Sequence, residues 1–124
     1  MRLSVLLAVL LAVGLGLAVT TSEAGQNIGT LTWLQSPFCN KITLTVVLEG
    51  PVAMLAGFDD LCGAAQRAPV YGTAVANLDG SFAMGLTEVV NGFNGVSTYV
   101  TLSPSTLAGT WSDDAGNTGN WVPQ

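Results

Sequence analysis

The 124-residue sequence predicts an all-β fold, an antiparallel up-and-down meander of about eight strands that forms a small barrel or a flattened barrel. Beyond residue 24, apolar and polar residues alternate along most of the chain, which is the period of a strand with one buried face. Turns rich in Gly, Asp, Asn and Pro recur about every 8–12 residues, and no segment there has a helical period. The length suits one domain, residues 25–124.

The first 24 residues have the organisation of a secretory signal peptide. Arg2 supplies a positive start, residues 3–19 are almost continuously apolar, and Ser22-Glu23-Ala24 provides a cleavage box. A transmembrane anchor is the alternative, but an apolar stretch of about 17 residues is short for a span. We therefore expect a cleaved signal helix, a secreted or periplasmic domain, and no membrane attachment after cleavage.

The first four expected strands cover residues 28–34, 41–48, 52–58 and 70–78. In the first, Leu31 and Trp33 share one face. The second has the clearest alternation, since every other residue from Ile42 to Leu48 is apolar. Glu49-Gly50-Pro51 turns the chain into the third strand, and Pro69 limits the loop before the fourth to one helical turn.

The last four expected strands cover residues 81–90, 96–102, 107–112 and 118–122. Asp79-Gly80 predicts a two-residue hairpin turn between the fourth and fifth strands. Asp and Gly residues within 113–117 predict the turn of a closing hairpin. If 118–122 pairs with 28–34 the sheet closes into a barrel, and if it does not, this hairpin is an exposed edge.

Several glycines lie inside the expected strands, where glycine weakens a strand and often marks a bend or a close backbone approach. Gly57, Gly72 and Gly109 occupy such positions. A small, sharply coiled antiparallel sheet needs repeated bends of this kind. We therefore interpret these glycines as a bending device that is used several times.

Two resemblances extend this interpretation. Gly109-Thr110-Trp111, the Gly-rich turn that follows and the meander order resemble the calycin-type barrels, the avidin and lipocalin class, which implies a ligand-binding barrel. In that class the Gly-x-Trp strand usually comes first, whereas here it lies near the end. The run from Pro37-Phe38-Cys39-Asn40 through residues 59–65 to Trp111 resembles small secreted bacterial proteins of uncharacterised function, which implies no activity.

Cys39 and Cys62 are the only cysteines, and an even number in a secreted domain predicts one disulfide. A redox pair is the alternative, but the two are far apart and form no C-x-x-C motif. Without residues 1–24 the chain keeps two cations and seven carboxylates, so its net charge stays at −5. This balance excludes a basic patch, and with it nucleic acids and anionic membranes as partners.

The sequence contains no histidine, which removes the commonest general base and metal ligand. Lys41, the only lysine, starts a strand, and a solvated position there is favoured over a Ser-Lys dyad. The remaining chemistry is that of paired carboxylates: Asp59 and Asp113, on different turns, could act together in an acid hydrolase. Turn formation and solubility are the favoured use of these residues, and Asp59 or Asp60 is expected to pair with Arg67. No catalytic residue, metal site or cofactor is predicted.

Two further features bear on function. Glu88 continues the apolar face of Phe82, Met84 and Leu86, so it lies either at the rim of the sheet, which is favoured, or in a pocket. The tryptophans lie on the first and last strands and would become neighbours if the sheet closes. There they would form either a core plug, which is favoured, or a stacking floor for a ligand. The candidate ligand-binding residues are Trp33, Met84, Val100, Trp111 and Trp121.

These observations predict a secreted, non-catalytic binding or interaction module. One hypothesis is a barrel that holds a small apolar ligand in its interior. The alternative is a structural or adhesion-type module with a filled core and a surface protein as partner, and the acid hydrolase is the third hypothesis. The volume of the internal cavity separates the first two.

Overall fold

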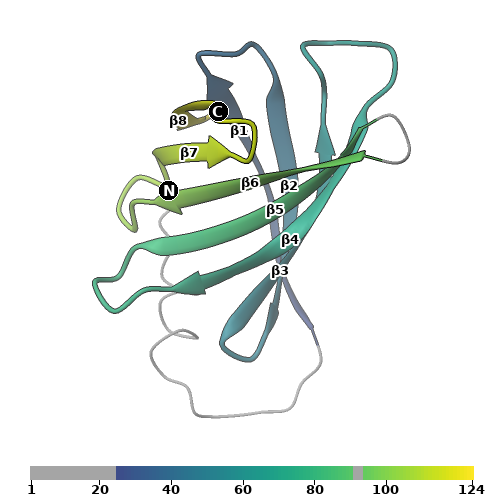
Figure 1. Ribbon diagram of the computed structural model, residues 1–124. Coiled ribbons are helices and arrows are strands. Elements are labelled where there is room, and N and C mark those ends of the chain that lie inside the picture. The colour runs from purple at the N-terminus through teal and green to yellow at the C-terminus, as the bar shows by residue number, and fades with distance from the viewer. Residues whose placement is uncertain (1–24, 91–93) are drawn as a thin grey trace.

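In the computed structural model, which describes residues 25–90 and 94–124, eight strands follow one another in chain order around a closed barrel (Figure 1). Each strand is antiparallel to its neighbours. The strands are β1 (Gln26–Ser36), β2 (Lys41–Glu49), β3 (Val52–Asp59), β4 (Ala68–Ala76), β5 (Phe82–Val90), β6 (Asn94–Leu102), β7 (Gly109–Asp113) and β8 (Thr118–Pro123). The predicted all-β meander is confirmed, while the proposed signal peptide, residues 1–24, lies outside the described residues.

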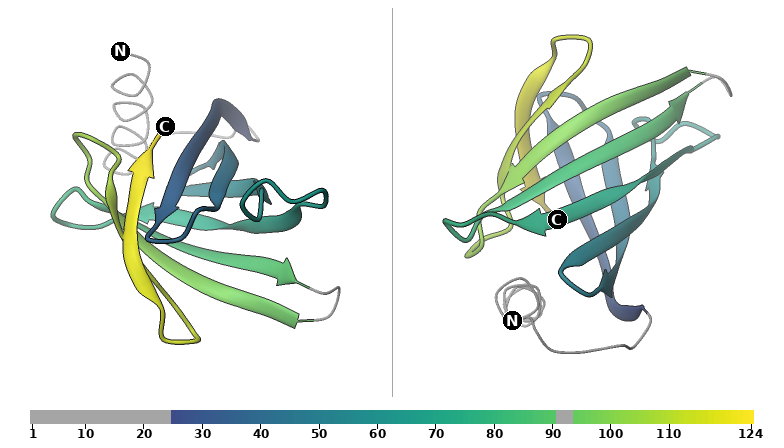
Figure 2. Two further views of the ribbon diagram at one scale, coloured as in Figure 1. Left: turned by 90° about the horizontal axis from the view of Figure 1, so that it is seen from above. Right: turned by 60° about the horizontal axis from the view of Figure 1, so that its bottom comes forward.

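The first and last strands close the ring. β1 pairs with β2 along most of its length and with β8 over Trp33–Ser36, where Gln35 lies opposite Trp121. Figure 2 shows β8 running beside β1 on one side of the barrel. Of the two alternatives left open by the sequence, the structure shows the closed one: β8 pairs with β1, and β7 and β8 are not a free edge.

The connection between β4 and β5 differs from the predicted two-residue turn. β4 ends at Ala76, which pairs with Phe82, so the loop covers residues 77–81 and Leu78 lies exposed within it. The backbone N–H of Asn77 donates to the Ser81 carbonyl at 2.7 Å, and Asp79 Oδ1 accepts from the Ser81 hydroxyl at 2.6 Å. These side-chain bonds stabilise a wider loop than Asp79-Gly80 alone predicts.

Alternate residues of every strand point into the barrel and form one apolar core. At its centre the rings of Trp33 and Trp121 pack with centroids 5.0 Å apart. The indole N–H of Trp33 donates to the Leu107 carbonyl at 2.8 Å, and that of Trp121 donates to Gln35 Oε1 at 3.1 Å. Because both buried N–H groups have partners, these tryptophans fill the core without leaving an unpaired donor.

The strand glycines allow neighbouring strands to approach closely. At Gly57, Gly72 and Gly109, a backbone carbonyl of an adjacent strand lies where a Cβ atom would be. No other residue therefore fits at these positions without a shift of the backbone. Such contacts allow a small sheet to coil tightly enough to close. Gly85 is different, because nothing lies within 4 Å of the position of its missing Cβ.

Candidate functional site

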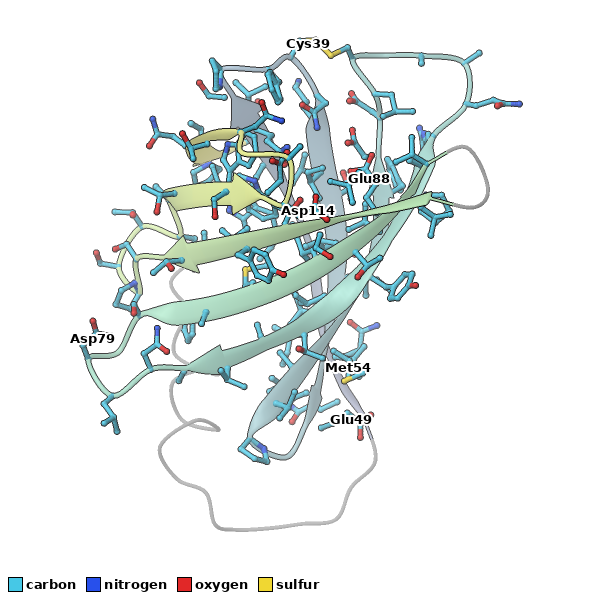
Figure 3. All side chains as sticks on the ribbon, viewed as in Figure 1. Cys39, Glu49, Met54, Asp79, Glu88 and Asp114 are labelled. Carbon is cyan, nitrogen blue, oxygen red and sulfur yellow. A yellow bond between two sulfur atoms is a disulfide. The ribbon has the colours of Figure 1, made fainter. Side chains whose placement is uncertain are left out.

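The end of the barrel that carries the disulfide holds an open hollow of about 570 Å³, which we call the mouth. The mouth is bounded by the β1–β2 loop (37–40), the β3–β4 loop (60–67) and the inner faces of the strands that end there. Figure 3 shows Cys39 and Glu88 toward this end and Glu49 at the opposite end. Its polar lining residues are Gln35, Asn40, Asp59, Glu88, Thr98 and Asp113, and its larger apolar ones are Phe38, Leu61 and Val96.

The polar residues of the mouth continue the inward faces of their strands. Gln35 is in phase with Trp33, Asp113 with Trp111, and Glu88 with Leu86, so each points to the inside where the apolar core gives way to the hollow. Along each of these strands, the inward-facing side chains therefore change from apolar to polar within two residues.

Asp59 joins the two loops of the mouth. It is only 2% exposed, its Oδ2 accepts from Asn40 Nδ2 at 2.9 Å, and its Oδ1 accepts from the Leu61 backbone N–H at 2.8 Å. The predicted disulfide between Cys39 and Cys62 is confirmed and links the same two loops. A buried carboxylate without a cation requires hydrogen bonds of this kind.

Glu88 and Asp59 line the same hollow, and the Asp59 carboxyl group is the acidic neighbour that acts on the Glu88 carboxyl group. Burial in the barrel and this adjacent carboxylate together raise the pKa of Glu88 from 4.5 to about 8. At neutral pH Glu88 therefore keeps its proton. The sequence leaves a rim position, which is favoured, and a pocket position open for Glu88. The residue is half-buried and lines the mouth, so it lies both near the rim of the sheet and in a hollow.

Asp113 lines the same hollow but is occupied by its own turn. Its Oδ1 accepts from the backbone N–H groups of Ala115 at 3.0 Å and Asn117 at 2.8 Å, and its Oδ2 accepts from Asn117 Nδ2 at 3.0 Å. Partial burial raises the pKa of Asp113, but these hydrogen bonds outweigh it and hold the pKa below its ordinary value. The carboxylate that faces Asp59 is thus that of Glu88, and an acid hydrolase based on Asp59 and Asp113 stays a prediction.

The expected pairing of Asp59 or Asp60 with Arg67 is not present among the described residues. The Arg67 guanidinium lies 4.0 Å from the centroid of the Phe58 ring, on the face of β3 opposite to Asp59. Asp60 Oδ1 instead accepts from the Lys41 backbone N–H at 2.8 Å and from that of Cys62 at 3.0 Å. In the described chain, neither lysine nor arginine lines the mouth.

The apolar interior contains a second cavity, of about 40 Å³, toward the opposite end of the barrel. Val100 and Trp111 do not line it: together with Met84 they line a separate open hollow of about 600 Å³ over β5 to β8, while Trp121 is buried in the core. The cavity of about 40 Å³ is lined by Trp33 and Met84. Pockets for small organic ligands are about 300–1,000 Å³, so this cavity has room only for water-sized molecules. Binding of an apolar ligand by these five residues stays a prediction.

Sequence reasoning did not single out Gln35, Asn40 and Phe38, which also line the mouth. A signal was present for Gln35, since it continues the inward face of Leu31 and Trp33 and is 8% exposed. Asn40 and Phe38 lie in a loop, where the alternation of apolar and polar residues does not predict which way a side chain points.

Across residues 25–90 and 94–124, no group of three or more His, Cys, Asp and Glu residues is placed to hold a metal ion. The same part of the chain contains no helix of the length and hydropathy that crossing a membrane requires. No protein-family model, curated protein or solved structure matches the chain. The closed eight-stranded meander is consistent with a calycin-like fold, and this likeness is one of architecture alone.

Proposed function

We propose that this protein is an extracytoplasmic, non-catalytic binding module whose mouth holds a small ligand with a cationic group and an apolar part. The observation that supports this most directly is the open hollow of about 570 Å³, with the carboxyl pair of Asp59 and Glu88 in its wall. The volume lies within the range of small-molecule sites, whereas the interior cavity is far too small.

The charge of the mouth favours a cation. Hydrogen bonds lower the pKa of Asp113 and favour its ionised form, and Asp59 adds a carboxyl group that accepts from two N–H donors. Among the described residues, no lysine or arginine lines the mouth to offset this charge. A positively charged group that enters the hollow would gain a favourable interaction with carboxylates that are partly removed from water.

The apolar wall favours a ligand with a carbon skeleton. Phe38 is 44% exposed and packs against Trp111 with ring centroids 5.6 Å apart. An ammonium group over an aromatic face gains about 0.5–2 kcal/mol. Val96 and Leu61 add further apolar surface to the lining of the hollow.

The disulfide supports an extracytoplasmic location for the protein. Cys39–Cys62 joins the two loops that form the mouth, and disulfides persist in oxidising, extracytoplasmic surroundings. The same bridge limits the movement of the site, which reduces the entropy lost on binding.

A structural or adhesion-type module is the second candidate. The nearly filled core supports it, since an interior cavity of about 40 Å³ leaves no space for an apolar ligand inside the barrel. It predicts that small molecules do not bind in the mouth.

Binding of benzyltrimethylammonium, compared with its neutral analogue neopentylbenzene, separates the two candidates. At pH 9 we expect the cation to bind with a dissociation constant below about 1 mM and the neutral analogue to bind at least about tenfold more weakly. Phe38→Ala should weaken binding of the cation, and Tyr71→Ala, an exposed aromatic residue on the outer face of β4, should not. Equal binding of both compounds, or no binding of either, would overturn the proposal and favour the filled-core module.

A further inference from the structure

We infer that the mouth is regulated by a proton: the single proton shared by Glu88 and Asp59 holds the place of a ligand's cationic group, which enters only as the proton leaves. This inference rests on the function proposed above, because it concerns the same site and the same class of ligand. It names the condition under which that site is open.

Asp59 holds both loops of the mouth, so the proton that it shares with Glu88 affects the whole site. Its two oxygens already accept hydrogen bonds from Asn40 and from the backbone of Leu61, one on each loop of the mouth. Glu88 on β5 lines the hollow together with Asp59, so a buried carboxyl group that is held by both loops lies in the same hollow as a second carboxyl group from the wall. A group that competes for Asp59 must first displace Glu88.

Among the described residues that surround Glu88, none supplies a positive charge that could replace the proton. Its partners across the sheet are Val70 on β4 and Val96 on β6, both neutral. The other acidic group that lines the described mouth is Asp113 on β7. On the β3–β4 loop, Asp60 is bound by backbone N–H groups, while Arg67 lies over the outward ring of Phe58.

Loss of the proton would leave two carboxylates in contact, a repulsive arrangement that a bound cation relieves. Burial and the facing Asp59 carboxylate raise the pKa of Glu88 to about 8, so the proton is still held at neutral pH. The site is therefore closed to cations in mildly acidic surroundings and opens as the pH rises. An ammonium ligand and the proton compete for one position.

Calorimetric titration with benzyltrimethylammonium tests the inference, because this cation has no proton of its own. Between pH 6 and pH 8 its affinity should rise about tenfold per pH unit and then level off. At pH 7, titrations in two buffers of different ionisation enthalpy should show about one proton released per cation bound.

Two variants sharpen this test. Glu88→Gln keeps a hydrogen-bond donor toward Asp59 but cannot release a proton, so its affinity should be constant over this range. Glu49→Gln makes the same chemical change at an exposed position at the far end of the barrel and should behave as the unmodified protein. In the free protein, the carboxyl carbon resonance of Glu88 should titrate with a midpoint near 8, which checks the shared proton without any variant.

The possible failures are distinct. Binding of the cation with an affinity independent of pH and without proton release would overturn the inference and leave the proposed function intact. A Glu88 that titrates near 4.5 would overturn it as well. No binding between pH 6 and pH 9, with Glu88 titrating near 8, would overturn the proposed function, and the inference with it.

Discussion

Replacing Glu88 with glutamine should make the protein more stable at alkaline pH. The unfolded chain loses the Glu88 proton near pH 4.5, whereas the folded chain keeps it to about pH 8. The folded state therefore binds more protons in this interval, and the stability of the unmodified protein falls as the pH rises through it and becomes level above pH 8. The glutamine amide donates to Asp59 at every pH, so the variant lacks this loss.

The magnitude follows from the difference between the two pKa values. A rise from 4.5 to about 8 corresponds to about 5 kcal/mol, at about 1.4 kcal/mol per pKa unit. Glu88 is only half-buried, and its ionised carboxylate is screened by water, so we expect about 2 kcal/mol. For a domain of this size, that difference raises the melting temperature of the variant at pH 9 by roughly 8–16 °C.

Urea denaturation followed by tryptophan fluorescence, at several pH values from 4 to 9, measures this effect. The unmodified protein and Glu88→Gln should be equally stable at pH 4 and diverge as the pH rises. Glu49→Gln should follow the unmodified protein, because Glu49 is exposed. If the stabilities of Glu88→Gln and the unmodified protein stay parallel within about 0.5 kcal/mol over the whole range, the shared proton has been assigned incorrectly.

Three further predictions concern the barrel. Replacing Cys39 and Cys62 with serine should cost about 3 kcal/mol, because the bridge closes a loop of 23 residues, and urea denaturation of the double variant measures the loss. Gly72→Ala should cost about 1–3 kcal/mol because its Cβ meets a backbone carbonyl, whereas Gly85→Ala, in open space, should be neutral or stabilising; equal melting temperatures would contradict this. Gln35→Met should cost about 1–3 kcal/mol by leaving the buried indole N–H of Trp121 without an acceptor, and an unchanged urea midpoint would argue against that hydrogen bond.

The strand order of the fold could be predicted from the sequence because the alternation of apolar residues is strong on most strands. The alternation from Ile42 to Leu48 predicts the buried face of β2, and all four alternating apolar positions, Ile42, Leu44, Val46 and Leu48, are buried. The loop after β4 was predicted less well, since Asp79-Gly80 is a local turn signal and Asn77 and Ser81 bond across it. Turn length depends on such side-chain bonds, which a two-residue motif does not contain.

The candidate site was predictable only in part. Glu88 stood out because a charge continued an apolar face, and Asp59 was considered for its chemistry. Their closeness depends on the register and coiling of the barrel, because Asp59 lies opposite Ala68 on β4 whereas Glu88 lies opposite Val70, two residues further along that strand. Pairing across an intervening strand depends on register and twist, and neither is encoded in the spacing of Asp59 and Glu88 along the chain.

The seam between β1 and β8 has a kinetic consequence. Those strands pair over only four residues, and the hydrogen bond from Trp121 to Gln35 joins groups 86 positions apart in the chain. Because bringing such distant segments together costs loop-closure entropy before any contact repays it, ring closure should be a late step of folding, on a scale of about milliseconds to seconds. During synthesis, β1 cannot pair with β8 until β8 has left the ribosome. The barrel therefore stays open until that strand is available.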